Sequence, residues 1–208
     1  PSWYIKTTAI KQDLLRENST TDWHPETIKT GRFGDWLNNN IDWAVSRNRY
    51  WGTPLPIWIC EEKHQTAVGS LKELSELSGK DVTNTDPHRP FVDDITISCP
   101  ECKKTASRVP EVIDCWYDSG AMPFAQWGYP ENNKETFEAS YPADFICEAI
   151  DQTRGWFYTL LAVGTLVGRG AAFRNVISLG HLLDAKGQKM SKSKGNVVDP
   201  WTEIERWG

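Results

Sequence analysis

Residues 144–179, DFICEAIDQTRGWFYTLLAVGTLVGRGAAFRNVISL, decide the fold of this chain. They contain an apolar run of strand length at 145–150 and a strongly apolar run of helix length at 153–167. A second strand-like run, rich in β-branched residues, follows at 173–179. This order predicts two parallel strands joined by a right-handed crossover. We therefore expect an α/β fold that binds its ligand beyond the carboxyl ends of these strands.

Polar residues follow each of the two predicted strands. Glu148, Asp151 and Gln152 stand at the end of the first strand, and Gly180 and His181 directly follow the second. A pair of carboxylates suits ribose hydroxyls or an ammonium group, and a glycine lets a flat base approach closely. Two alternatives stay open: Glu148 can be a strand-end carboxylate that faces water or an arginine such as Arg154, and His181 can be a structural imidazole.

The segment 189–196, KMSKSKGN, comes a few residues later, at the same edge of the predicted sheet. Its lysines, serines and glycine cannot bury an apolar face, but mobile ammonium groups and hydroxyls can surround a polyphosphate. A run of this composition is also typical of a solvated turn. Together with the strand-end carboxylates it indicates a nucleoside-triphosphate site, although the chain has no Gly-x-x-x-x-Gly-Lys-Ser/Thr phosphate loop.

The chain is rich in tryptophan, with 11 residues, which implies wide flat contact surfaces in the core or at a ligand. Trp156 follows Gln152 by about one helical turn, so the two side chains would share a face. That face lies at the N-terminal end of the predicted helix and points at the strand-end crevice. For Trp156, as for Trp116, packing in the core is the alternative.

The first part of the chain, residues 1–58, is interpreted as a helical and extended entry segment. We predict a short strand at 3–5 and helices at 8–17 and 35–45 from the spacing of their apolar residues. The two prolines within residues 47–58 exclude a helix there, so that stretch is expected to be extended or looped.

Residues 59–109 differ in character and are interpreted as a small module inserted into a larger fold. Ser70 is expected to cap a short helix at 71–77 that ends at Gly79, and residues 91–97 are expected to form a strand. The module has few apolar residues from which to build a core.

Four residues of this module could hold a metal ion. Cys99 and Cys102 form a Cys-x-x-Cys turn, and Cys60 and His64, separated by three residues, provide a second pair of ligands. Three thiolates and an imidazole can bind Zn²⁺ as a tetrahedron. Because the module has little core, packing does not explain the Cys-x-x-Cys turn well. Free cysteines of a degenerate site are the alternative.

Composition excludes several classes of protein. The net charge of −5 argues against a general nucleic-acid coat, and no apolar run is long enough to span a membrane. An odd number of cysteines without a secretory signal argues for a reducing, cytoplasmic setting, with Cys115 and Cys147 buried in apolar strands. The chain begins at Pro1 and stops within a helix predicted to start at Asp199, so we expect it to be a piece of a longer protein.

The sequence KMSKS at 189–193 resembles the second signature of the class I aminoacyl-tRNA synthetases. Three further motifs are similar to the isoleucine branch of that class: RYWGTP at 49–54, DCWYDSG at 114–120 and DQTRGWF at 151–157. The resemblance covers essentially the whole chain. It implies that residues 110–208 form the second half of a Rossmann-like, parallel-sheet nucleotide-binding domain, with the module as a zinc-ribbon-like insertion.

The resemblance implies roles for the candidate residues by position. Trp116 and Trp156 would wall the side-chain pocket for isoleucine, with Gln152 alongside. Glu148 and Asp151 would hold the amino group and the ribose of the aminoacyl-adenylate.

The same resemblance locates the nucleotide. Gly180 and His181 would lie beside the adenosine. The loop would hold the phosphates of ATP, with Mg²⁺, through Met190, Ser191, Ser193 and two catalytic lysines, Lys189 and Lys192. Lysines that meet negative charge as it builds on the pyrophosphate accelerate attack on the α-phosphorus, rather than merely tightening binding.

The implied activity is that of an ATP-dependent ligase, cytoplasmic and monomeric at full length, that joins isoleucine to tRNA(Ile). The first class I signature, His-x-Gly-His, does not occur in this sequence, so we expect negligible activity from the isolated piece. Two rival functions are a nucleotidyltransferase with another acceptor and a zinc-stabilised binding module. The paired indoles disfavour a polar acceptor, and the strand-end carboxylates have no use in a binding module.

Overall fold

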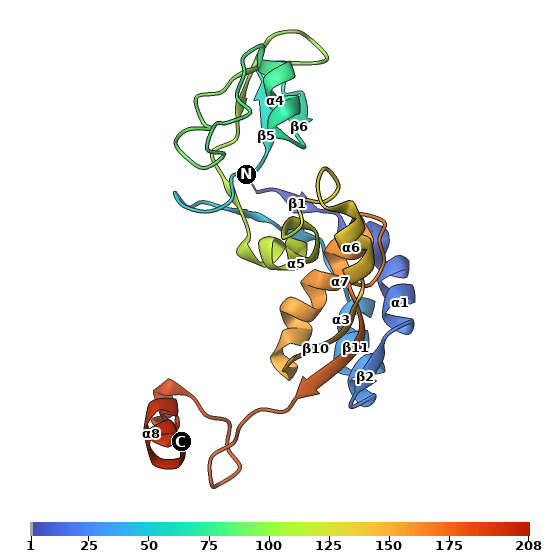
Figure 1. Cartoon of the computed structure of the whole chain (residues 1–208), viewed down its shortest axis with the longest axis vertical. Helices are drawn as coiled ribbons and strands as arrows, with labels where there is room; N and C mark the ends of the chain where they lie inside the picture. Colours follow the sequence, from blue (N-terminus) through green and yellow to red (C-terminus); the bar gives the residue numbers. More distant parts are fainter. Residues whose placement is uncertain (1) are drawn as a thin grey trace.

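The computed structural model describes residues 2–208, which form a mixed α/β fold built on a small parallel sheet (Figure 1). The sheet has the strand order β10 (Ala143–Ala149), β11 (Phe173–Leu179) and β2 (Asp22–His24), and all neighbours are parallel. Helix α7 (Trp156–Leu166) connects β10 to β11. The predicted strand–helix–strand unit is therefore confirmed, whereas β2 was not expected from the sequence.

Helix α7 lies in the main core because it is apolar on all sides. Eight of its eleven residues are buried. Five of these belong to one cluster with Ile146, Val176 and Trp23, which are register neighbours on the three parallel strands. Helices α1 (Lys11–Ser19) and α3 (Arg32–Asn38) add apolar side chains to the same cluster. Each fully buried large apolar side chain contributes about 1.5–3 kcal/mol to stability.

Helix α7 begins three residues later than predicted because a glycine interrupts the chain. Residues Ile150–Arg154 form a 3-10 turn, η2, and Gly155 then adopts φ −141° and ψ −118°. A Cβ atom on residue 155 would collide with the side-chain carbonyl of Gln152, so a larger residue here would displace that side chain. Trp156 is the first residue of the helix.

The helix predicted at 35–45 is wrong in its second half. The observed helix ends at Asn38, and β3 (Trp43–Ala44) pairs antiparallel with β1 (Tyr4–Ile5). Asn38 and Asn39 donate side-chain hydrogen bonds to carbonyl groups four residues earlier, at 3.0 and 2.8 Å. Asparagine side chains compete in this way with the backbone pattern of a continuing helix. The other elements of this segment are η1 (Thr7–Ile10), which leads into α1, and α2 (Thr27–Thr30).

The module predicted at 59–109 begins two residues earlier, because its four-stranded antiparallel sheet includes Ile57 and Trp58, and it lies at one end of the molecule (Figure 1). Its strand order is β6 (Gln65–Ala67), β5 (Ile57–Cys60), β8 (Thr105–Arg108) and β7 (Ile97–Ser98). The predicted caps of its helix, α4 (Leu71–Ser78), are confirmed. Ser70 Oγ accepts a hydrogen bond from the Glu73 N–H at 3.1 Å, and Gly79 ends the helix with φ +69°.

The module has a hydrophobic core of its own, contrary to the expectation from its composition. Trp58, Leu74 and Ile97 are each 2% exposed. The Trp58 indole N–H donates to the carbonyl group of Ile95 at 2.7 Å. The predicted strand at 91–97 is wrong, because most of this segment forms turns and the Ile95 carbonyl is bound by an indole rather than by a neighbouring strand.

Helix α5 (Cys115–Ala125) crosses α7 at short range. A Cβ atom on Gly120 would lie 2.6 Å from the carbonyl oxygen of Thr159, so glycine permits the close approach of the two helices. Strand β9 (Val112–Ile113) directly precedes α5 and pairs antiparallel with β4 (Ser46–Arg47). Helix α6 (Lys134–Ser140) follows α5 in the chain. This crossing fixes the first turn of α5 relative to the start of α7.

Cys115 and Cys147 are exposed, which corrects the expectation that both are buried. Cys115 is the first residue of α5 rather than part of a strand. Cys147 alternates with buried Ile146 along β10 and therefore points to the opposite face of the sheet. That face also exposes Phe145 and Leu179, so the described part of the chain leaves it uncovered.

Beyond β11, residues 180–199 lead away from the sheet to α8 (Pro200–Trp207), at the end of the molecule opposite the module (Figure 1). Asp199 caps α8 as predicted, since its Oδ1 accepts a hydrogen bond from the Trp201 N–H at 3.1 Å. Within residues 2–208, every helix falls short of the length and apolar character needed to cross a membrane.

Truncation of one leucine of α7 tests the importance of the main core. Leu161 is 0% exposed. We expect Leu161→Ala to lower the free energy of unfolding by about 2–5 kcal/mol, because it removes buried methyl groups and leaves a cavity. Urea denaturation measures the change. The matched control is Leu182→Ala, at a side chain that is 82% exposed, which should change stability by less than about 0.5 kcal/mol. Equal effects of the two substitutions would contradict the assigned core.

Candidate functional site

The carboxylates predicted at the strand ends are exposed at the carboxyl end of the parallel sheet. Glu148 is the penultimate residue of β10, and Asp151 follows in η2, where its Oδ2 accepts a hydrogen bond from Gln152 Nε2 at 3.3 Å. Neither carboxylate forms an ion pair within residues 2–208. Arg154 instead donates to the backbone carbonyl of Arg32 at 2.8 Å. Both carboxylates are therefore exposed and without a cationic partner in this part of the chain.

The two tryptophans of the predicted amino-acid pocket meet around Gly155. The Trp156 N–H donates to Oε1 of Gln152 at 2.8 Å, and the Trp156 indole donates to the carbonyl of Ser119 at 3.2 Å. A Cβ atom on Gly155 would lie 3.1 Å from the ring of Trp116. The structure therefore brings Trp116, Gln152 and Trp156 close together, with Gly155 leaving room for the ring of Trp116 and the side chain of Gln152.

The two indoles border different cavities. Trp156 lines a small cavity of about 80 Å³. The other residues around it are mainly apolar: Met122, Pro123, Gln126, Trp127, Phe137, Ser140, Tyr141, Ala143, Ile146, Leu160 and Ala172. Trp116, which is 42% exposed, lines a more polar cavity of about 280 Å³ on the other side, together with Arg49, Trp51 and Asp118. The apolar cavity beside Trp156 suits a branched aliphatic group.

Asp114 fixes the start of α5 and was missed as a site residue by the sequence analysis. It is 4% exposed, and its Oδ1 accepts a hydrogen bond from the Trp116 N–H at 3.1 Å. Its Oδ2 forms an ion pair with Arg47 at 2.6 Å and accepts a longer bond from the Trp43 indole. The signal in the sequence was an aspartate directly before a helix, the usual N-cap pattern. Asp114 thus holds the backbone that carries Trp116.

Asp118 lies in the same helix and has an unusual environment for a carboxylate. Burial raises its pKa above the ordinary value, and the nearby charge of Asp114 acts in the same direction. A hydrogen bond from the Thr53 hydroxyl at 3.1 Å opposes this shift. The polar cavity therefore contains an acidic group that holds its proton more strongly than a carboxyl in water.

Residues 184–196, which contain the lysine-rich segment, form a folded loop that we term the lysine loop. Hydrogen bonds of Asp184 and Asn196 hold it together. Asp184 accepts hydrogen bonds from the N–H groups of Lys186 and Gln188 and from the Asn196 side chain, at 2.8–2.9 Å. These bonds, that of Asn196 first, lower the pKa of Asp184. Asn196 in turn accepts from the Ser191 N–H at 2.9 Å. An Asp-x-x-Gly turn, ending at Gly187, was the overlooked signal.

The loop presents its functional groups to solvent. Lys189 and Lys192 are exposed, and the hydroxyls of Ser191 and Ser193 lie 3.1 Å apart. The short 3-10 turn η3 (Lys192–Lys194) spans the last two lysines of the segment, and Met190 precedes it. Within residues 2–208, no hydrogen bond or ion pair joins this loop to the strand-end carboxylates or to the indoles.

Gly180 and His181 are exposed directly after β11. They connect the sheet to the lysine loop, whose path leads away from the sheet in Figure 1. A single nucleotide site formed by the loop and the strand ends therefore stays a prediction.

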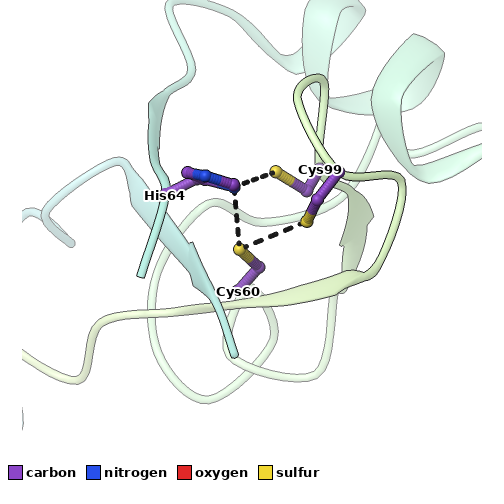
Figure 2. Close-up of side chains that lie close together, drawn as sticks. Cys60, His64 and Cys99 are labelled. Carbon is purple, nitrogen blue, oxygen red and sulfur yellow. Dashed lines mark hydrogen bonds between the residues drawn. The ribbon is translucent and has the colours of Figure 1, made fainter. Parts of the chain in front are cut away.

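The four metal-ligand candidates of the module do come together (Figure 2). Their ligand atoms all lie within 4.8 Å of one another. Nδ1 of His64 is 3.6 Å from Sγ of Cys60 and 3.7 Å from Sγ of Cys99, and the sulfur atoms of Cys60 and Cys102 are 3.6 Å apart. A tetrahedron with metal–sulfur bonds of about 2.3 Å has edges of about 3.8 Å, so these separations fit.

The ligands are held by two similar turns. The Lys63 N–H donates to the Cys60 carbonyl and the Lys103 N–H to the Cys99 carbonyl, both at 2.9 Å, and both lysines have positive φ. Hydrogen bonds, above all from the Cys102 N–H, lower the pKa of the Cys99 thiol to about 6. A thiolate stabilised in this way is the form that binds a metal ion.

Loss of the Asp114 carboxylate tests its structural role. We expect Asp114→Ala to lower the free energy of unfolding by about 1–3 kcal/mol, because α5 loses its cap and the partly exposed Arg47 loses its ion-pair partner. Urea denaturation, followed by tryptophan fluorescence, gives the change. Asp144→Ala, at an exposed aspartate of β10, is the control and should have little effect. A loss below about 1 kcal/mol for Asp114→Ala would contradict the proposed anchor.

Comparison with known proteins identifies similar sequences and folds. Residues 1–208 match the family model described as tRNA synthetases class I (I, L, M and V). The isoleucine–tRNA ligase of Streptomyces avermitilis is 64% identical over 210 residues, and that of Thermobifida fusca is 60% identical over 215 residues. Each alignment covers 100% of this chain and 20% of the relative. The chain therefore spans about a fifth of the length of these relatives.

Among solved structures, the chain is similar to the methionyl-tRNA synthetase of Mycobacterium tuberculosis bound by methionyl-adenylate. The TM-score is 0.60 at 20% identity, over 100% of this chain and 31% of that chain. At this level of identity, the similarity establishes the fold alone.

Proposed function

Because this chain belongs to the class I tRNA synthetases of the I, L, M and V group, we propose that it is part of an isoleucine–tRNA ligase. The complete enzyme would activate isoleucine with ATP and transfer it to tRNA(Ile) in the cytoplasm. The observation that carries the proposal is the mainly apolar cavity lined by Trp156, the first residue of α7, whose helix follows the turn that contains Asp151. The high identity to isoleucine–tRNA ligases supports the same specificity.

The parallel sheet serves in this proposal as the second half of a Rossmann-like nucleotide-binding domain. Parallel sheets bind ligands beyond the carboxyl ends of their strands, where Glu148, Asp151, Gly180 and His181 stand. The carboxylates would receive the ammonium group of the amino acid and the ribose hydroxyls. Their exposure, and the lack of ion-pair partners within residues 2–208, support a role with a ligand.

The side chain of isoleucine would enter the cavity beside Trp156. The cavity has mainly apolar walls, so a branched aliphatic group gains free energy on transfer into it from water. Gln152, whose Oε1 accepts from the Trp156 N–H, would fix the indole at the entrance. Trp116, on the other side of Gly155, would close the site towards the polar cavity.

The lysine loop would act on the phosphates of ATP. Lys189 and Lys192 are exposed on a loop that is ordered within itself but not bound to the sheet, so they can reach a ligand at the strand ends. Met190, Ser191 and Ser193 would complete the contact with the nucleotide. Ammonium groups placed where charge develops on the leaving pyrophosphate lower the barrier to adenylate formation, and Mg²⁺ with ATP would share that charge.

The module would bind Zn²⁺ in a structural role. Cys60, His64, Cys99 and Cys102 would fill all four positions of a tetrahedron, so no position would stay open for a substrate. An oxygen of Glu101 lies 3.7 Å from Nε2 of His64, so this carboxylate can orient the imidazole from the side away from the metal. Neither rival function explains the site as well. A nucleotidyltransferase with a polar acceptor has no use for the apolar cavity, and a binding module has none for the strand-end carboxylates.

Adenylate binding tests the proposed specificity. In the full-length enzyme, a non-hydrolysable isoleucyl-adenylate analogue should bind about 10- to 200-fold more tightly than its valyl counterpart, because the cavity holds one more methylene. Trp156→Ala should weaken the isoleucyl analogue and reduce this ratio, as measured by titration calorimetry. The matched control is Trp201→Ala, at an indole of α8 that is 73% exposed. An unchanged ratio in Trp156→Ala would refute the assigned pocket.

Metal analysis tests the zinc site. The purified protein should contain one Zn²⁺ per chain. His64→Ala should lower the affinity for Zn²⁺ by more than roughly 10- to 100-fold, the loss typical of removing a residue that only orients a metal ligand, as measured by competition with a chelator. His24→Ala, at an exposed histidine of β2, should leave the affinity unchanged. Protein without bound zinc, or wild-type affinity in His64→Ala, would favour the alternative of free cysteines.

A further inference from the structure

The inserted module contacts residues 49–52, a loop outside the module that we term the Arg49 loop. The indole of Trp51 stacks on the imidazole of His88, with ring centroids 5.0 Å apart and an interplanar angle of 6°. The next residue of the module, Arg89, places its guanidinium over the ring of Tyr50, 5.2 Å from the centroid. Arg89 also donates to the Arg49 carbonyl at 3.2 Å. Two successive module residues thus contact three successive residues of the loop.

His88 and Arg89 are themselves held firmly within the module. Nδ1 of His88 lies 2.7 Å from an oxygen of Asp86, which also accepts from the His88 N–H at 2.9 Å. Arg89 donates to Asp93 at 2.8 Å, and Asp93 pairs in turn with Arg108 on β8. The side chain of Arg108 is only 1% exposed. The contacts with the Arg49 loop are therefore held in place, through Asp93 and Arg108, by the same sheet that carries the cysteine and histidine cluster.

The Arg49 loop forms one wall of the cavity of about 280 Å³ that Trp116 borders. Arg47, on the same wall, is occupied by its ion pair with Asp114. The Arg49 guanidinium, in contrast, has no hydrogen-bond or ion-pair partner anywhere in residues 2–208. Trp51 is 67% exposed although one ring face is covered by His88, so its other face is open. The loop offers a free cation and a free aromatic face side by side.

This pair of groups matches the chemistry of a single-stranded nucleotide. Bases stack on aromatic side chains, and guanidinium groups bind backbone phosphates, without need for a particular sequence. Isoleucine carries no group that requires a second cation, and the proposed phosphate site for ATP lies at the lysine loop. The cavity adjoins Trp116, which borders the proposed amino-acid site, so a nucleotide here would lie next to the activated acyl group.

We propose that His88 and Arg89 are positioning residues that hold Trp51 and Arg49 as a subsite for the acceptor end of the tRNA. This inference rests on the proposed function and deepens it. The module would serve the transfer step through the Arg49 loop, while activation of the amino acid would proceed without this contact.

Steady-state kinetics of the full-length enzyme with His88→Ala test the inference. We expect the KM for tRNA in aminoacylation to rise about 3- to 10-fold, the loss expected for one aromatic stack. Isoleucine-dependent ATP–pyrophosphate exchange should stay within about twofold of wild type. His88→Phe, which preserves a flat ring for Trp51, should restore the KM for tRNA. Phe91→Ala is the matched control, because this aromatic side chain of the same segment is 56% exposed and stacks on no ring in residues 2–208.

Several results would overturn the inference. An unchanged KM for tRNA in His88→Ala would show that the stack does not position the acceptor. Equal losses of exchange and aminoacylation, or failure of His88→Phe to restore the KM, would reduce His88 to a structural residue. Absence of isoleucine-dependent exchange in the wild-type enzyme would contradict the proposed function itself, and the inference with it.

Discussion

The burial of α7 among the side chains of the parallel sheet is the interaction on which the rest of this structure depends. The helix has no polar face, so it is stable only inside a core formed by the three strands and two further helices. Its burial fixes the strand ends at one side and Gly155 at the turn before the helix. Through Gly120 it also fixes α5. The positions of both indoles therefore follow from the packing of one apolar helix.

The sequence was sufficient to predict elements whose signals are local. The strand β11 and the caps of α4 and α8 were correct, because β-branched runs and Ser, Asp, Pro and Gly at helix ends act within a few residues. The predictions were wrong where the conformation of a segment depends on residues far away in the sequence. Trp43 forms a strand because β1 is available to pair with it, and residues 91–94 turn because the module core and the Trp58 indole hold that segment.

In the candidate site, too, the residues held by local turns were predictable from the sequence, and the contacts between distant residues were not. Spacing alone identified the cysteines and His64, because two short turns place the four ligands. The stack of Trp51 on His88 and the ion pair of Arg47 with Asp114 join residues 37 and 67 positions apart, respectively, and no pattern in the sequence reveals such pairs. The lysine loop was recognised from its composition, but its internal order depends on Asp184 and Asn196, 12 residues apart.

The uncovered face of the parallel sheet has a practical consequence. Parallel sheets in proteins are covered on both faces, whereas here Phe145, Cys147 and Leu179 are open to solvent. Such a face makes this length of chain prone to self-association when it is handled alone. The reactivity of Cys147 also reports whether this face is covered. A thiol-alkylating reagent reaches Cys147 while the face is exposed, and loses access once another layer of protein packs on it.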